Sequence, residues 1–209
     1  MVQARPRIDS KVSEKEIAEA DKESCILCFN EIIFFALGSC SHTAVCAKCS
    51  LRIRLLMDDK NCTLCKQELK EVVITSDRSL TWKKFDDRVR HDCDQDRADD
   101  SIFYTDRPSK IEGMKLRTLT CLISNCSTKQ TFANQESLRR HMETVHQKTF
   151  CLVCLKGRTV FIREQRIYHM QKLRMHIEHG DPASDRGAEI LPHPWCDFCE
   201  EYFFDGSEF

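Results

Sequence analysis

The spacing of cysteines and histidines constrains this chain more than any other feature of its sequence. Eight of these residues form four close pairs, each with one or two residues between its members: Cys25 and Cys28, Cys40 and His42, Cys46 and Cys49, and Cys62 and Cys65. Thiolates and imidazoles in such pairs are ligands of structural zinc, and eight of them fill two tetrahedral sites. Because so short a unit buries little apolar surface, we expect the metal to complete its fold.

The order of the four pairs is typical of a RING finger, in which the pairs alternate between two ions. We therefore predict a cross-braced RING domain over residues 23–70. Two independent zinc ribbons or a PHD-type cluster are the alternatives, but a PHD cluster usually has a tryptophan before its last pair, and Met57–Asn61 has none. The predicted ligands are Cys25, Cys28, Cys46 and Cys49 for the first zinc and Cys40, His42, Cys62 and Cys65 for the second. With four protein ligands each, both ions are structural.

A RING domain has no nucleophile of its own. It binds a conjugating enzyme already loaded with ubiquitin and holds the thioester in a reactive geometry, which is catalysis by positioning. Three residues match the surface that RING domains use for this contact: Ile26, Ile53 on a helix predicted over Lys48–Met57, and Lys66. Core packing is the alternative role for Ile53. The sequence thus predicts a ubiquitin ligase whose partner is a loaded conjugating enzyme.

Two RING positions depart from the commonest pattern. Lys66 lies where many RING domains carry a basic residue that contacts both the enzyme and ubiquitin, and a lysine offers a point charge rather than the fork of an arginine. Thr63 replaces a proline that is frequent within the last Cys-x-x-Cys. The choice of conjugating enzyme therefore stays open.

Residues 116–147 have the pattern of a two-Cys/two-His zinc finger. Phe132 and Leu138 occupy its small core, and Ser137–Met142 is predicted to be its helix. The predicted ligands are Cys121, Cys126, His141 and His146. Since the following unit is longer and differently spaced, base readout by regular tandem fingers is not expected. Arg139 and Arg140 leave two alternatives open, RNA phosphates or an acidic protein face.

Residues 148–194 are predicted to be a second, longer and atypical finger. Cys151 and Cys154 begin it, and His176 ends a helix-like segment. Spacing alone leaves His179 and His193 as alternatives for the fourth ligand. His169 is expected at the surface. A third pair, Cys196 and Cys199, begins an incomplete finger over residues 195–209 with no histidine after it.

The remaining segments are polar. Residues 1–22 are predicted to be disordered. Residues 71–115 are predicted to be an acidic linker, with Glu71–Thr75 as a strand that packs on the RING and Ser101–Tyr104 as a docking patch. Asp86–Asp106 holds eight Asp against three Arg, whereas Arg139–Gly180 holds nine Lys or Arg against three Glu. The basic stretch is either a solvated face or a binding surface, and Cys93 belongs to no ligand set.

The cysteine pattern also bears on the compartment. All of the 14 cysteines except Cys93 are clustered at the spacing of metal ligands, and no apolar signal segment precedes them. We therefore expect a reducing compartment, the cytosol or nucleus, with cytoplasmic as the preferred assignment and no membrane partner. The expected fold class is small zinc-stabilised α+β modules, a cross-braced RING followed by irregular two-Cys/two-His fingers.

The RING and the fingers together resemble the RING and zinc-finger ubiquitin ligases that sense collided ribosomes. The resemblance runs from about Glu23 to Phe209. The sequences that carry it most clearly are Phe150–Cys154, Leu173–His176, Gly180–Pro182 and His193–Cys199. It implies that His193, rather than His179, completes the second finger.

The resemblance further implies that the chain ubiquitinates small-subunit ribosomal proteins on stalled ribosomes, as part of translation quality control. Relatives continue with further fingers and a proline-rich tail. Two alternative functions remain at this point. One is a non-enzymatic scaffold whose fingers bind RNA or protein, and the other is a zinc-finger transcription regulator.

Overall fold

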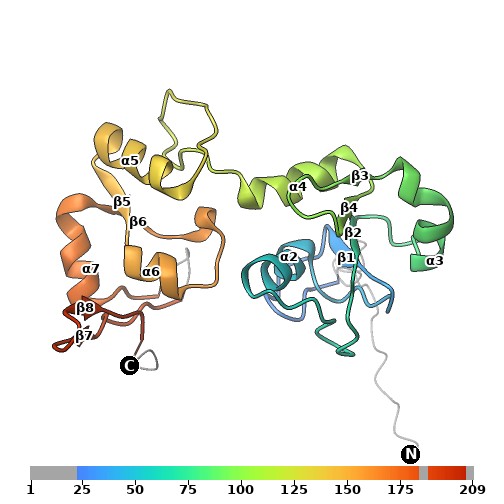
Figure 1. Cartoon of the computed structure of the whole chain (residues 1–209), viewed down its shortest axis with the longest axis horizontal. Coiled ribbons are helices and arrows are strands. Elements are labelled where there is room, and N and C mark those ends of the chain that lie inside the picture. The colour runs from blue at the N-terminus through green and yellow to red at the C-terminus, as the bar shows by residue number, and fades with distance from the viewer. Residues whose placement is uncertain (1–22, 184–187, 206–209) are drawn as a thin grey trace, which may run out of the picture.

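The computed structural model describes residues 23–183 and 188–205, and these fold into two lobes joined through the end of one helix (Figure 1). The first lobe contains residues 23–117, and the second contains residues 118–183 and 188–205. The segment 1–22, predicted to be disordered, lies outside the described residues. No helix within the described ranges is both long and apolar enough to cross a membrane.

The first lobe is built on a sheet with the strand order β1-β2-β4-β3. β1 (Phe35–Leu37) pairs antiparallel with β2 (Val72–Thr75), which pairs parallel with β4 (Ile102–Tyr104). β3 (Asp94–Gln95) adds an antiparallel edge to β4. The predicted RING helix is present as α2 (Ala47–Leu56). The predicted strand over Glu71–Thr75 is present as β2.

The prediction of an acidic linker over residues 71–115 differs from the structure. This segment forms the middle and one edge of the sheet, and it also contains helical elements: α3 (Trp82–Lys84), the π-helix η1 (Phe85–Val89), the 3-10 helix η2 (Arg90–Asp92) and α4 (Arg107–Arg117). The predicted docking patch, Ser101–Tyr104, contains β4, whose three residues are buried. We call residues 71–117 the RING extension.

The RING extension was predicted to be a linker because its sequence is rich in acidic residues. Several of its carboxylates form ion pairs within the same segment. Glu71 and Asp86 pair with Arg90, and the buried Asp96 pairs with Arg117. Asp106 caps the first turn of α4 by accepting a hydrogen bond from the Ser109 amide. With these charges paired, the few apolar residues between them are free to enter the core.

The RING extension covers the first metal-binding region directly. The side chains of Phe85 and Phe103 are buried in one cluster with Cys25, Cys46 and Cys49, and their rings meet edge to face with centroids 5.4 Å apart. Cys93 is half-buried against the same cluster. The apolar core of this lobe therefore depends on the segment beyond the predicted RING boundary at residue 70.

The second lobe contains the two predicted fingers and short paired strands. Its elements are α5 (Gln135–His146), β5 (Lys148–Phe150), α6 (Leu152–Gly157), η3 (Ile162–Glu164), β6 (Ile167–His169), η4 (Met170–Lys172), α7 (Leu173–His179), β7 (Trp195–Cys196) and β8 (Glu201–Tyr202). β5 pairs antiparallel with β6, and β7 with β8. A capping box between Asn134 and Ser137 begins α5, and Gln147 ends it in the left-handed conformation.

The two fingers share one apolar core and do not fold as independent domains. Phe132, Leu138 and Met142 of the first finger are buried together with Phe150 and Ile162 of the second. A smaller cluster surrounds Cys151, Cys154 and Ile190. The fingers therefore pack together as one unit.

Candidate metal centres

The structure brings together all four ligand sets that the sequence predicts. In each set the four donor atoms lie within 4.8 Å of one another. The sets are Cys25, Cys28, Cys46 and Cys49; Cys40, His42, Cys62 and Cys65; Cys121, Cys126, His141 and His146; and Cys151, Cys154, His176 and His193. The first two sets alternate along the chain, so the first lobe has the cross-braced arrangement of a RING.

The donor atoms in the RING are spaced as a tetrahedral zinc site requires. Sulfur and nitrogen donors about 2.3 and 2.0 Å from one ion stand roughly 3.3–3.8 Å from each other. Cys28 Sγ and Cys46 Sγ are 3.8 Å apart, and Cys62 Sγ lies 3.6 Å from His42 Nδ1. Zinc fits both sites, and with four protein donors its role is to hold the loops.

Two of the three Cys-x-x-Cys loops of the RING, at Cys25 and at Cys62, are tight turns set by backbone hydrogen bonds. The amide of Phe29 donates to Cys25 O at 2.8 Å, and that of Lys66 donates to Cys62 O at 2.9 Å. Both donors have positive φ, 59° and 61°. This turn directs the two sulfurs of a pair toward one point.

The C-terminal pair adopts the same turn. Glu200 has a φ of 54°, and its amide donates to Cys196 O at 2.9 Å. Within the described residues, however, neither Cys196 nor Cys199 belongs to a group of three or more possible ligands. The pair has the backbone of a zinc-binding loop, and the described chain supplies half of a site.

The finger sites are equally compact. Cys121 Sγ lies 3.5 Å from His146 Nε2, and Cys126 Sγ lies 3.3 Å from His141 Nε2. In the second finger, Nε2 of the buried His193 lies 3.4 Å from Cys151 Sγ and 3.2 Å from His176 Nε2.

The structure also resolves the choice left open by spacing. His193 occupies the fourth ligand position, whereas His179 and His169 are exposed. Gly180, with a φ of 69°, returns the chain after α7, and a Cβ at this position would stand 2.2 Å from Ile190 O. The amide of His193 then donates to Ile177 O at 2.9 Å. The glycine turn therefore brings a distant histidine beside the α7 ligand.

The titration of the paired thiols also indicates a cation at the second finger. A hydrogen bond from Cys154 lowers the pKa of Cys151 to about 4, and the same bond is the main cause that raises the pKa of Cys154. Two thiolates so close together repel each other unless a positive charge lies between them. Zinc supplies this charge.

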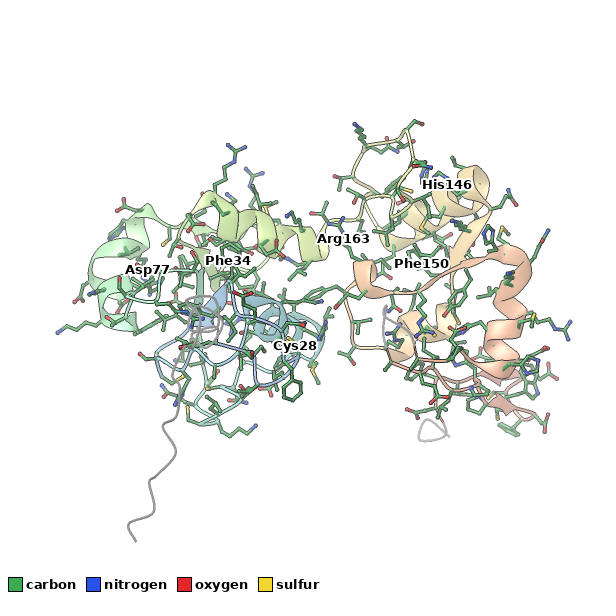
Figure 2. All side chains as sticks on the ribbon, turned by 180° about the vertical axis from the view of Figure 1, so that it is seen from behind. Cys28, Phe34, Asp77, His146, Phe150 and Arg163 are labelled. Carbon is green, nitrogen blue, oxygen red and sulfur yellow. The ribbon has the colours of Figure 1, made fainter. Side chains whose placement is uncertain are left out.

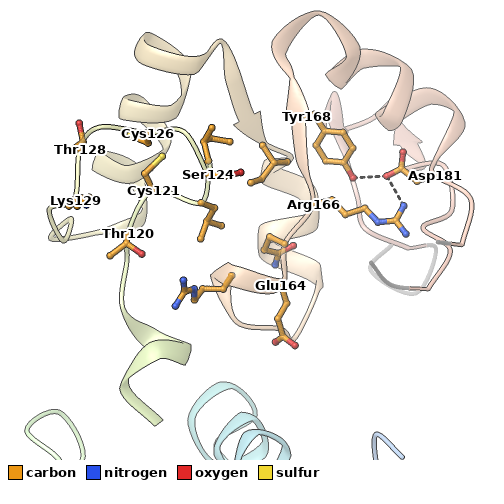
Figure 3. Close-up of a pocket in the computed structure, with 15 residues that line it drawn as sticks. Thr120, Cys121, Ser124, Cys126, Thr128, Lys129, Glu164, Arg166, Tyr168 and Asp181 are labelled. Atoms are coloured by element: carbon orange, nitrogen blue, oxygen red, sulfur yellow. Dashed lines mark hydrogen bonds and ion pairs between the residues drawn. The ribbon is translucent and has the colours of Figure 1, made fainter. Parts of the chain in front are cut away.

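A network that the sequence analysis missed supports His176. Asp181 Oδ2 lies 3.0 Å from His176 Nδ1, an ion-pair distance without good hydrogen-bond geometry. The same oxygen accepts a 2.6 Å hydrogen bond from Tyr168 and lies 3.2 Å from Arg166, as Figure 3 shows. Burial would raise the pKa of Asp181, but the hydrogen bond from Tyr168 and the charge of Arg166 lower it overall. A carboxylate behind a zinc-bound imidazole orients the ring and increases its basicity.

The predicted conjugating-enzyme residues are all at least partly exposed on the RING. Ile26 is 42% exposed and Lys66 is exposed, while Ile53 is half-buried. The Ile26 amide donates to Ala44 O at 3.1 Å, and Ala44 and Ile53 line one hollow together with Leu64. Leu64 is a further exposed apolar residue on this surface that the sequence analysis did not select. These residues form the candidate conjugating-enzyme face.

Comparison with known proteins supports the assignment of both lobes. Residues 20–107 match the family model of the ZNF598 RING finger domain. The chain is 31% identical over 199 residues to the E3 ubiquitin-protein ligase hel2 of Schizosaccharomyces pombe, an alignment that covers 94% of this chain. The RING segment of this chain therefore belongs to the ZNF598 RING finger domain family.

Further relatives align over the same region. Identity is 29% over 205 residues with the E3 ubiquitin-protein ligase ZNF598 of Danio rerio and 30% over 186 residues with that of Homo sapiens, covering 95% and 88% of this chain. The chain spans 26% of the length of the fission yeast relative and 20% of that of the fish relative. No solved structure matches it.

The family match also clarifies the RING boundary. The Hel2/ZNF598 RING model ends at residue 107, so it includes most of the segment that the sequence analysis treated as a linker. This agrees with the packing of Phe85 and Phe103 onto the first zinc site. The pairwise alignments extend further and include the fingers.

Proposed function

We propose that this chain is a cytoplasmic RING-type ubiquitin ligase that transfers ubiquitin from a conjugating enzyme to lysines of small-subunit ribosomal proteins on stalled ribosomes. The observation that carries the ligase activity is the cross-braced set of eight ligands in a domain that matches the Hel2/ZNF598 RING. The relatives are named E3 ubiquitin-protein ligases. The ribosomal target follows from the sequence resemblance described above.

In this mechanism the RING contributes positioning. The amine of a target lysine attacks the thioester carbonyl of the loaded conjugating enzyme, the enzyme cysteine leaves as a thiolate, and the amine loses its proton as the isopeptide bond forms. Ile26, Ile53 and Leu64 present an apolar surface to the enzyme, and the exposed ammonium of Lys66 is available to the enzyme and ubiquitin. Bound zinc fixes the loops that carry these residues.

The proposal is tested by combining the purified chain with ubiquitin, its activating enzyme and a panel of conjugating enzymes. We expect the wild-type chain to form ubiquitin chains with at least one conjugating enzyme. Ile26→Ala should lose this activity while its zinc content and circular dichroism stay unchanged. Ile33→Ala is the matched control, because Ile33 is 65% exposed on the RING and lies outside the proposed face. If Ile26→Ala forms ubiquitin chains as well as the wild type does, Ile26 is not part of the conjugating-enzyme face.

The ribosomal target is tested separately by sedimentation with ribosomes over a salt series. Contacts between basic residues and phosphates weaken steeply with salt, so co-sedimentation is expected to fall in that way. Absence of ubiquitin transfer with every conjugating enzyme, in a fully metallated chain, would instead support a non-enzymatic scaffold that binds RNA or protein.

A further inference from the structure

Two consecutive residues of the second finger enter two different cores. Phe161 is 3% exposed and packs in the first lobe with Leu51 of α2 and Tyr104 of β4, among other residues. Its neighbour Ile162 is 6% exposed and packs in the shared core of the fingers. We call residues 158–165, between α6 and β6, the bridging loop. The loop joins the lobes at a point far along the chain from their covalent connection.

The bridging loop also forms an ionic contact with the RING helix. The carboxylate of Glu164 accepts hydrogen bonds of 2.6 and 2.7 Å from Arg52 Nη2, and Lys48 Nζ lies 2.6 Å from it. The side chains of Arg52 and Glu164 are 23% and 22% exposed. Figure 3 shows Glu164 pointing out of the finger lobe toward the ribbon of α2. Two cations therefore depend on one carboxylate from the other lobe.

The loop itself is held in the conformation that this contact needs. Glu164 Oε2 accepts a 3.0 Å hydrogen bond from the Phe161 amide, so the carboxylate closes the turn behind the buried ring. Arg163, which Figure 2 labels at the junction of the lobes, donates to Lys115 O of α4 at 3.3 Å. Burial alone would raise the pKa of Glu164, but hydrogen bonds from Lys48 and Arg52 lower it, so the group is ionised at neutral pH.

This contact leaves the candidate conjugating-enzyme face free. Lys48 and Arg52 are four residues apart on α2 and share one side of it. Ile53 follows Arg52 by one residue and so lies about 100° around the helix. The fingers and a conjugating enzyme can therefore occupy α2 at the same time.

We propose that the bridging loop fixes the finger pair against the RING, and that Phe161 and Glu164 are positioning residues that set where a finger-bound target stands relative to the loaded conjugating enzyme. The part of this inference that concerns ubiquitin transfer rests on the function proposed above. The part that concerns the lobes stands on the geometry of the loop. The occupant of this side of α2 is the second finger of the same chain.

The test compares the intact wild-type chain with Glu164→Arg, which places a third cation beside Lys48 and Arg52. Small-angle X-ray scattering and amide hydrogen exchange report whether the lobes separate. The matched control is Glu178→Arg, a charge reversal on the same finger at an exposed pair with Arg174. Because the chain holds zinc on cysteines, both methods are chosen to avoid thiol labelling.

We expect Glu164→Arg to increase the radius of gyration and to speed exchange in residues 158–165, and Glu178→Arg to change neither. Ubiquitination of a ribosome-bound target should fall roughly tenfold, because misplacement of reacting groups is costly. Discharge of ubiquitin to free lysine, which needs only the RING, should stay within about twofold. The double variant Arg52→Glu/Glu164→Arg, in which the two charges are swapped, should restore the compact form and target ubiquitination.

Unchanged scattering and exchange in Glu164→Arg would overturn the proposal. An equal loss of lysine discharge and target ubiquitination would also overturn it, since the residue would then act on the RING reaction itself. If the wild-type chain transfers no ubiquitin at all, the proposed function fails, while scattering and exchange still decide whether the bridging loop holds the lobes together.

Discussion

The RING lobe and the finger lobe each hold two zinc sites, but they surround them with different amounts of apolar structure. In the RING lobe, Phe103 packs toward the first zinc site, and its neighbour Tyr104 packs into a second cluster against α2 and β2. The finger lobe has two-stranded sheets in place of a four-stranded one, and the cluster around its last zinc site contains few buried residues other than ligands. The difference suggests that zinc shares the stabilisation of the RING lobe with a sheet, whereas it dominates in the second finger.

The largest expected effect tests this contrast at the second finger. Cys151→Ser removes a buried ligand from a site whose zinc supplies roughly 10–16 kcal/mol of apparent binding energy in comparable small units. We expect bound zinc to fall by one ion and amide protection to be lost in residues 148–183, while β2 and β4 stay protected. Full zinc content with unchanged protection would show that the apolar contacts of the second finger suffice.

A core substitution in the RING lobe should act in the opposite way. Phe103→Ala leaves all zinc ligands in place but removes a buried ring, which typically costs about 3–5 kcal/mol. We expect a lower midpoint of chemical denaturation for the RING lobe without loss of zinc. Phe198→Ala, at a residue 99% exposed, is the control and should leave the midpoint unchanged. Equal effects of the two substitutions would contradict the assigned role of the RING extension.

A buried ion pair in the RING extension has a somewhat smaller expected effect. Asp96 accepts hydrogen bonds from Tyr104 and Arg117. Burial acts to raise the pKa of Asp96, yet these hydrogen bonds lower it overall. Asp96→Asn should cost about 3 kcal/mol, because it leaves Arg117 without its carboxylate.

The sign of the pH dependence follows from that lowered pKa. The stabilisation by Asp96 is complete above the pKa of the carboxyl in the unfolded chain, about 3.9. It is lost as the pH falls through the lower pKa of the folded state. The difference in unfolding free energy between wild type and Asp96→Asn should therefore be constant between about pH 6 and 8. A difference that disappears within that range would contradict the assignment.

The smallest effect concerns the second layer of the last zinc site. Asp181→Asn keeps the four ligands but removes the charge beside His176, and changes of this kind reduce metal affinity by about 10–100-fold. Competition with a chromophoric chelator measures the affinity. The control is Asp197→Asn, an exposed carboxylate that contacts Trp195. Equal zinc affinity in the two variants would remove Asp181 from the metal centre.

The same contrast explains what could be predicted from the sequence. Ligand spacing is local, so the sets were predictable wherever pairs stand close together. The choice between His179 and His193 was not decided by spacing, because it depends on how the Gly180 turn returns the chain. The RING extension was missed because its buried residues, such as Phe85 and Phe103, are separated by acidic stretches whose charges are paired only in the folded lobe. The contact of Arg52 with Glu164 joins residues 112 positions apart, and no local pattern signals it.

The central claim is that the RING lobe performs ubiquitin transfer through the face that contains Ile26. The most direct measurement is the rate at which the intact, fully metallated chain discharges ubiquitin from a pre-loaded conjugating enzyme to free lysine. We predict a clear acceleration over the conjugating enzyme alone, lost in Ile26→Ala and kept in Ile33→Ala. A rate equal to that of the conjugating enzyme alone, across the panel of enzymes, would contradict the account.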